Sequence, residues 1–259
     1  MKTAVKLILI YLLIQVVGVA VVAPAVLLLA HLTGMHDVHA IIPSLIVSML
    51  LMLGYLYKKG YLTGRPNPFA GVRPTFCLWA VVAGGSFIVL EEGLVSLLNF
   101  LPNWMDAVFE ELAYSWWGIG GICLLGPVLE EVLFRGAVTK HLLERYRPCL
   151  AILLSGLLFG LFHINPVQVV AATLSGWLLG WLYWRSGSLW PSILVHVMNN
   201  SFSVYLMRTH PDIENFRELF TREDYLVLLL LSALLLGVSL WAMQRSRVKP
   251  LDLSLPHAE

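Results

Sequence analysis

Three apolar segments of the chain carry ionisable or amide side chains at helical spacing. The first holds two adjacent glutamates and an arginine, the second a histidine, and the third a histidine and an asparagine. In chain order, these residues are Glu130, Glu131, Arg135, His163, His196 and Asn200. An ionisable side chain in the middle of a membrane costs about 2.5–3.5 kcal/mol on insertion scales and is usually functional. We therefore take these six residues as the candidate site.

The first segment contains one glutamate that can pair with an arginine and one that cannot. Glu131 and Arg135 are four residues apart, so on a helix they share one face and can form an ion pair. Glu130 lies about 100° around the same helix and is left without that partner. A carboxylate of this kind can accept a proton as a general base. The alternative is structural, with both glutamates binding Arg135 or a neighbouring helix.

Two other Glu-Glu pairs in the chain serve as controls for this pattern. Glu110 and Glu111 stand near Asp106 in a segment typical of a short interfacial helix, where we expect a solvated acidic face. Glu91 and Glu92 fall late in the third apolar segment, where we expect them to snorkel to the membrane interface. Neither pair is followed by an arginine at four-residue spacing, so the pattern at 130–135 is distinct.

The two histidine segments supply groups that could assist such a base. His163 follows Phe159 by four residues, and Pro166 soon breaks the helix; by itself His163 is typical of a hydrogen-bonded packing residue. A second histidine in apolar sequence, His196, favours a catalytic role over a packing role for His163. His196 and Asn200 are four residues apart, so both could donate hydrogen bonds to a developing oxyanion. An interhelical polar clamp is the alternative for this pair.

Long apolar segments recur along the chain and would position these residues. Of the 259 residues, 58% are apolar and 13% are charged, which is far from the composition of a soluble globular domain. A membrane-crossing helix needs about 20 largely apolar residues. We therefore predict an all-α, polytopic membrane protein with about eight transmembrane helices, in one domain over residues 1–259 with its motif core at about 117–207. The predicted segments are residues 7–30, 38–57, 76–99, 117–141, 148–164, 167–184, 189–207 and 224–243.

Basic residues between these segments predict the orientation of the chain, because Lys and Arg accumulate on the cytoplasmic side of short loops. With the N-terminus inside, three basic residues fall outside and thirteen fall inside, so both termini are predicted to be cytoplasmic. The outside residues are Arg208, Arg217 and Arg222, and the inside residues are Lys2, Lys6, Lys58, Lys59, Arg65, Arg73, Lys140, Arg145, Arg147, Arg185, Arg245, Arg247 and Lys249. In this orientation Glu130 and His196 lie in the cytoplasmic half, whereas His163 lies about 10 Å deeper.

Several classes of function are excluded by what the sequence lacks. The net charge of +1 gives no basic patch for nucleic acid. The cysteines Cys77, Cys123 and Cys149 have no metal-type spacing, and we expect them to be reduced packing residues. No pair of membrane aspartates, no His-Glu-x-x-His sequence and no serine in a Gly-x-Ser-Gly setting beside a histidine is present. Aspartyl, thermolysin-like zinc and serine-dyad intramembrane proteases are therefore not indicated.

The three motifs together resemble those of the CAAX-protease and bacteriocin-processing family, which includes eukaryotic endopeptidases of prenylated CAAX proteins. They are Glu-Glu-x-x-x-Arg at 130–135, Phe-x-x-x-His at 159–163 and His-x-x-x-Asn at 196–200. The resemblance implies an intramembrane peptidase in which Glu130 and His163 activate a water molecule. It further implies that His196 and Asn200 stabilise the oxyanion, with Glu131 and Arg135 in support.

The same resemblance implies a substrate, a cofactor requirement and partners. The substrate would be a membrane-associated protein or peptide, such as a prenylated CAAX-type tail, and the other partner is the lipid bilayer. We expect that no cofactor is required. A zinc ion held by Glu130, His163 and His196 is the second option, because two histidines and a glutamate with an open position match catalytic zinc.

Two functions of other classes remain open. A proton-coupled transporter could use Glu130, His163 and His196 as a relay, since intramembrane acids and histidines often serve in this way. Transporters of this size can show two corresponding halves with broken helices, whereas the polar residues here cluster in the second half. A non-catalytic membrane scaffold or immunity protein that keeps the motifs is the third option.

Overall fold

The computed structural model describes residues 1–33, 41–62, 67–98, 100–213 and 215–253, and these residues form helices and their connections without any strand. The helices are α1 (Lys2–Thr33), α2 (Ile41–Lys58), α3 (Pro74–Val95), α4 (Asp106–Ala113), α5 (Trp116–Gly120), α6 (Gly126–Leu133), α7 (Lys140–Leu143), α8 (Pro148–Phe162), α9 (Pro166–Ser186), α10 (Trp190–Thr209) and α11 (Arg222–Arg245). Two π-helical turns, η2 (Gly121–Leu125) and η3 (Phe134–Thr139), and a 3₁₀ turn, η4 (Phe216–Leu219), complete the order. The all-α prediction is confirmed.

Each of the eight predicted apolar segments corresponds to helical structure, but eight membrane crossings are not confirmed. Among the described residues, five helical stretches are long and apolar enough to cross a membrane: Lys2–Leu29, Pro74–Val95, Trp116–Leu143, Pro166–Ser186 and Arg222–Arg245. Two apolar helices, Pro43–Lys58 and Pro148–Phe162, are shorter, and α10 is not among the five. The protein is a polytopic helical membrane protein. The predicted start of the second segment at residue 38 and Arg65 lie outside the described residues.

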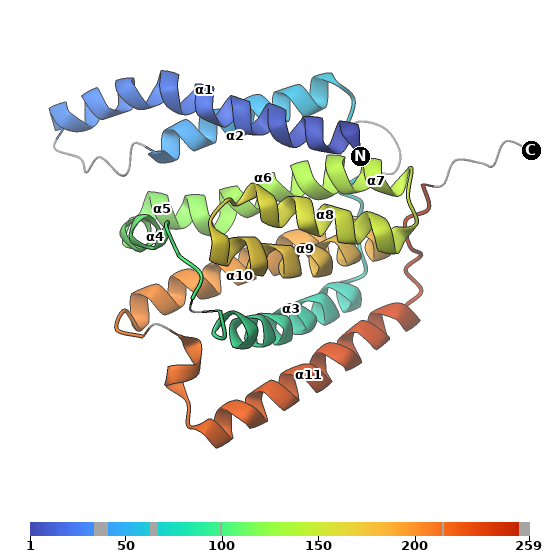
Figure 1. The fold of residues 1–259 in the computed structure, drawn as a ribbon. Helices are drawn as coiled ribbons and strands as arrows, with labels where there is room; N and C mark the ends of the chain where they lie inside the picture. Colours follow the sequence, from blue (N-terminus) through green and yellow to red (C-terminus); the bar gives the residue numbers. More distant parts are fainter. Residues whose placement is uncertain (34–40, 63–66, 99, 214, 254–259) are drawn as a thin grey trace, which may run out of the picture.

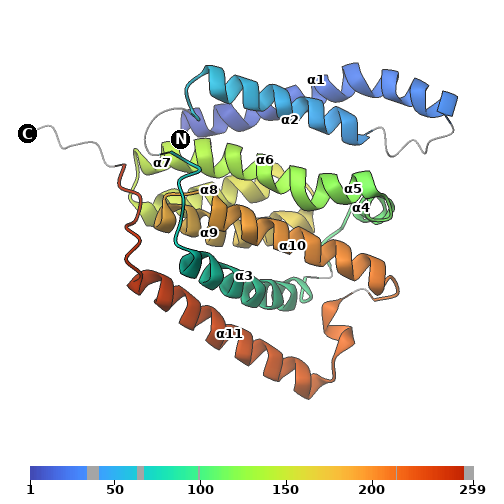
Figure 2. The ribbon, with the colours of Figure 1, turned by 180° about the vertical axis from the view of Figure 1, so that it is seen from behind.

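The helices lie side by side in a layered bundle (Figures 1 and 2). The α1–α2 hairpin covers one side, α11 covers the opposite side, and α3, α6, α8, α9 and α10 fill the space between them. The N-terminus and the C-terminal segment lie at the same end of the bundle (Figure 1). This arrangement agrees with an even number of crossings, as predicted from the charge distribution.

Two buried apolar clusters hold the layers together. In the larger, Phe134 of η3 packs edge-on against Phe159 of α8, with ring centroids 4.8 Å apart, and residues of α1, α2 and α6 surround them. In the smaller, Phe76 and Leu182 join α3 to α9, and Met243 of α11 packs against them. Both clusters border the motif helices, so they fix the relative positions of the candidate residues.

Glycine allows α8 and α9 to approach closely. A Cβ atom on Gly160 would collide with the side chain of Thr173 and the carbonyl oxygen of Val169, and one on Gly176 would lie 2.8 Å from the Cα of Gly156. Small residues of this kind let membrane helices pack backbone to backbone. The contact places the end of α8, which carries His163, against the α9 residues that line the site.

Residues 116–143 form one helical rod that contains two π turns. The regular α-helical stretch α6 lies between η2 and η3, so Glu130 and Glu131 are flanked on both sides by altered helix geometry. Pro127 occupies the first turn of α6. Single π turns inside α-helices are frequent at functional sites, because they redirect side chains and expose backbone groups.

Candidate active site

A fully buried ion pair lies at the base of the site. Arg135 Nη1 is 2.7 Å from Glu131 Oε1, and both side chains have no exposed surface. Arg135 Nη2 donates a hydrogen bond to the carbonyl oxygen of Gly176 at 3.3 Å, and the guanidinium lies 4.4 Å from the Phe159 ring centroid. The pair predicted from the four-residue spacing is present, and Phe159 of the second motif packs directly on it.

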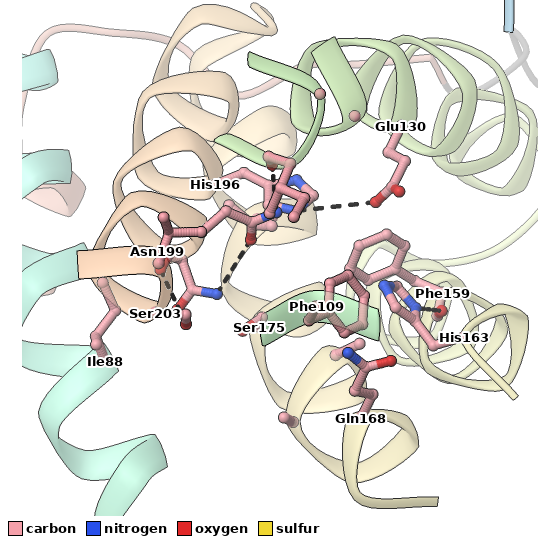
Figure 3. A pocket seen from close by; sticks show the side chains of 18 of the residues that line it. Ile88, Phe109, Glu130, Phe159, His163, Gln168, Ser175, His196, Asn199 and Ser203 are labelled. Carbon is pink, nitrogen blue, oxygen red and sulfur yellow. Dashed lines mark hydrogen bonds and ion pairs between the residues drawn. The ribbon is translucent and has the colours of Figure 1, made fainter. Parts of the chain in front are cut away.

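His196 connects the ion pair to the second glutamate. Its Nδ1 atom lies 2.9 Å from Glu131 Oε1, and its Nε2 atom lies 3.8 Å from Glu130 Oε2 (Figure 3). The same Glu131 oxygen already accepts from Arg135, so we assign the hydrogen of His196 to Nδ1. The sequence suggested that His196 and Asn200 act as a pair, whereas the structure turns the imidazole towards the two glutamates.

Glu130 keeps a carboxylate that is accessible for chemistry. Its side chain is 17% exposed, and in the described part of the chain it accepts no hydrogen bond within normal length. Glu130 and His196 both line the cavity described below. Glu131 is thus paired with Arg135, whereas Glu130 lies 3.8 Å from His196, and its role as the base stays a prediction.

His163 lies directly after α8 and presents one nitrogen to the same space. Its Nδ1 donates to the carbonyl oxygen of Phe159 at 2.9 Å, which leaves Nε2 as the acceptor in the neutral ring. Nε2 makes no hydrogen bond with the residues that the structure describes. The expected offset in depth does not separate His163 from Glu130, because α8 ends at Phe162 after only 15 residues and both side chains line one cavity.

The turn after His163 contains a residue with a positive φ angle and is held by hydrogen bonds of a buried asparagine. Ile164 adopts a φ of 62°, a left-handed conformation that is uncommon for a β-branched residue and that typically marks functional sites. The next residue, Asn165, is buried; its Oδ1 accepts from the backbone N–H of Trp104 at 2.9 Å, and its Nδ2 donates to Asn103 Oδ1 at 2.8 Å. These bonds tie the His163 turn to the segment before α4.

Asn200 is held by hydrogen bonds at both ends of its amide. Its Nδ2 donates to the carbonyl oxygen of Ile122 in η2 at 2.9 Å, and its Oδ1 accepts from Asn199 Nδ2 at 3.5 Å. One Nδ2 hydrogen is left over after the Ile122 bond. Asn200 lines the cavity with that hydrogen still available for a ligand.

One cavity of about 470 Å³ brings together four of the predicted site residues, Glu130, His163, His196 and Asn200. Figure 3 shows Glu130, His163 and His196 around it, contributed by α6, the end of α8 and α10. Gln15 of α1 and Met49 of α2 also contribute to its wall, so the N-terminal hairpin closes one side. A cavity of this size can hold a short peptide segment together with water.

Glu91 lines the cavity, so the prediction that it snorkels to the membrane interface is wrong. It is only 7% exposed, and Ser175 Oγ of α9 lies 2.8 Å and 3.1 Å from its two carboxylate oxygens. Glu91 and Glu92 therefore line the cavity instead of snorkelling to an interface. No sequence signal links Glu91 to Ser175, which is 84 residues away. The exposure predicted for Glu110 and Glu111 is confirmed.

The described residues contain no group of three histidine, cysteine, aspartate or glutamate side chains placed to hold a metal ion. The zinc alternative required Glu130, His163 and His196 to converge on one point. In the structure the Nδ1 atoms of His196 and His163 bond to Glu131 and to the carbonyl of Phe159, and the zinc alternative stays a prediction. The three cysteines are free thiols, as expected.

Glu130, two histidines and an asparagine thus line one cavity, and a buried Glu-Arg pair supports it from below. Residues 112–202 match the family described as Type II CAAX prenyl endopeptidase Rce1-like. A Bacillus subtilis (strain 168) protein, YdiL, described as a proposed membrane peptidase, is 27% identical over 196 residues, covering 73% of this chain and 77% of YdiL. Both findings support the resemblance on which the three motifs were interpreted. No solved structure matches the chain.

Proposed function

We propose that the protein is an intramembrane endopeptidase that hydrolyses a peptide bond with a glutamate-activated water molecule. The observation that carries this proposal is the common cavity of Glu130, His163, His196 and Asn200. The family match over residues 112–202 supports peptidase activity. Glutamate dependence and the identity of the substrate are our inference.

Glu130 acts as the general base in this mechanism. Its carboxylate accepts a proton from water, while His163 Nε2 accepts a hydrogen bond from the same water and orients it. The hydroxide oxygen attacks the peptide carbonyl and forms a tetrahedral oxyanion. Glu130 then gives its proton to the departing nitrogen, the C–N bond breaks, and the products are a carboxylic acid and an amine. No covalent intermediate is formed with the protein.

His196 and Asn200 stabilise the oxyanion. Asn200 offers the Nδ2 hydrogen that the Ile122 bond leaves free. His196 donates Nδ1–H to Glu131, so it can donate from Nε2 only as an imidazolium, a charge that the two neighbouring carboxylates offset. Donors of this kind, fixed before the reaction in a site shielded from water, contribute strongly to acyl-transfer catalysis.

We further propose that the substrate is a membrane-associated polypeptide, of which a prenylated CAAX-type tail is the first to test. The description of the matching family supports this choice. A lipid-modified chain terminus partitions into the bilayer, where the cavity walls from α1, α2 and α10 could receive it. The bilayer is thus both the solvent of the enzyme and the source of its substrate.

Cleavage of a fluorogenic peptide ending in an S-farnesyl CAAX sequence, by protein reconstituted in sealed vesicles, tests this function. We expect wild-type protein to cleave the peptide and His163→Ala to lower kcat by about 10²-fold or more, because a group that orients the water is lost. His31→Ala, at an exposed histidine of α1, is the matched control. Undiminished cleavage by His163→Ala would refute the proposed role.

Two further measurements on the same vesicles separate the alternatives. Loss of cleavage in a chelator, with recovery on adding zinc, would favour the metal-dependent mechanism over the metal-free one. A proton flux that Glu130→Gln abolishes, with no cleavage of any tested peptide, would identify a proton-coupled transporter. Absence of both activities would favour the non-catalytic scaffold.

We also propose that both termini are cytoplasmic, which is supported by the charge distribution and by the position of the N-terminus and the last turn of α11 at one end of the bundle (Figure 1). Single cysteines at Lys59 and Arg222, introduced without the three native cysteines, test this orientation. A membrane-impermeant maleimide applied to intact cells should label the Arg222→Cys variant, and should label Lys59→Cys only after lysis. The reverse pattern would invert the predicted topology.

A further inference from the structure

The hydrogen bond from Asn200 to Ile122 ends on a carbonyl oxygen inside a helix. In an α-helix each carbonyl oxygen accepts from the N–H four residues later, and in a π-helical turn from the N–H five residues later. A side chain that binds such an oxygen meets less competition when the usual backbone donor is absent. Ile122 lies within η2, in the middle of the rod that runs from residue 116 to 143, and still accepts from Asn200 Nδ2 at 2.9 Å.

Both usual donors to the Ile122 carbonyl are removed by the local sequence. The N–H four residues later belongs to Gly126, and it is directed to the carbonyl oxygen of Gly121 through the π turn. The residue five positions later is Pro127, which has no N–H. The π turn and the proline together thus leave the Ile122 oxygen without a helical donor, and Asn200 takes its place.

We propose that Pro127 is a positioning residue for the reaction, acting through Ile122 and Asn200. By keeping the Ile122 carbonyl open, Pro127 provides the acceptor that fixes one Nδ2 hydrogen of Asn200. The amide is then oriented with its nitrogen towards η2 and its second hydrogen free for the cavity. If an N–H were present at position 127, it would compete for the same oxygen, and the amide could rotate away. This inference rests on the proposed oxyanion role of Asn200.

Pro127→Ala tests the proposal, because alanine restores the missing N–H at little cost to a helix. We expect kcat for the fluorogenic peptide to fall about 10-fold or more, approaching the 10²–10³-fold loss typical of a removed oxyanion donor, while KM changes less than threefold. Replacing Pro127 with lactic acid gives the same methyl side chain on an ester, without the N–H. This second variant should retain wild-type kcat. Equal losses in both variants would overturn the proposal.

A double variant checks that the effect passes through Asn200. Pro127→Ala in an Asn200→Ala background should lower kcat no further than Asn200→Ala alone, because the amide to be positioned is gone. A further tenfold loss would show that Pro127 acts by another route. Pro148→Ala, at the first turn of α8, is the control for removing a proline from a helix N-terminus; it should leave kcat unchanged.

An infrared measurement separates failure of this inference from failure of the proposed function. With a ¹³C=¹⁸O label on the Ile122 carbonyl, Asn200→Ala should raise the amide I frequency in the protein that carries Pro127, because a hydrogen bond is lost. In the Pro127→Ala protein the same substitution should leave the frequency unchanged, because the restored backbone N–H at position 127 occupies the oxygen. A frequency that is insensitive to Asn200 in both proteins refutes the inference, whatever the peptide assay shows.

Discussion

Glu130→Gln is expected to lower kcat by about 10²–10⁴-fold, the range in which a general base contributes. Glutamine has the same shape as glutamate, so the cavity and its neighbours are preserved, but a carboxamide cannot accept the proton of the attacking water. KM should change little, because Glu130 contacts the water and the reacting carbonyl more than the rest of the peptide. Single-turnover cleavage in vesicles measures the chemical step directly.

The chain supplies a matched control for this experiment. Glu110→Gln makes the same chemical change in an exposed Glu-Glu pair, and it should leave kcat within twofold of wild type. A Glu130→Gln protein that retains wild-type kcat would eliminate Glu130 as the base. The adjacent residue in the chain, Glu131, would be a poor substitute, because it is already bound by Arg135 and His196.

Arg135→Met is expected to have the largest effect on stability, lowering the free energy of unfolding by about 3–5 kcal/mol. Methionine fills much of the arginine volume, but it leaves the buried carboxylate of Glu131 without its counter-charge. The bond to the carbonyl of Gly176 and the stacking on Phe159 are lost as well. Denaturant unfolding of the detergent-solubilised protein, followed by circular dichroism, measures the change.

A double variant separates stability from catalysis. Glu131→Leu together with Arg135→Met replaces the buried pair by apolar side chains, which should recover most of the lost stability. Activity should remain low, because His196 no longer has the Glu131 oxygen that orients it. Arg145→Met, at a half-exposed ion pair with Glu144, is the control and should cost less than about 1 kcal/mol. A fully active double variant would remove Glu131 from the mechanism.

Contacts within one helix were predictable from the sequence, whereas contacts between helices were not. The Glu131–Arg135 pair follows from a four-residue spacing, which fixes the distance once the helix forms. The bonds of His196 to Glu131 and of Asn200 to Ile122 join residues 65 and 78 positions apart. Their geometry depends on the rotation and depth of α10 against α6 and η2, and hydrophobic periodicity does not determine either quantity in a chain that is apolar on most faces.

The same limit explains the wrong prediction for Glu91. Near the end of an apolar segment, a glutamate facing lipid would snorkel, whereas one facing a polar cavity remains buried. Which face Glu91 occupies was decided by the packing of α3 on α9, where Ser175 provides its hydrogen bonds. Likewise, the apolar stretch at 148–164 predicted a helix correctly, but not that the helix would be too short to count as a crossing.

The shortness of α8 has a consequence for the surrounding lipid. Its 15 residues span about 22 Å, against about 30 Å for the hydrocarbon core of a bilayer. One stripe of the helix, formed by Leu150, Leu153, Leu157 and Leu161, is exposed, so lipid chains must adjust to it directly. A helix shorter than the bilayer creates a hydrophobic mismatch, and local thinning of the membrane accommodates this mismatch. Such thinning brings the headgroup layer and its water towards His163, at the end of α8.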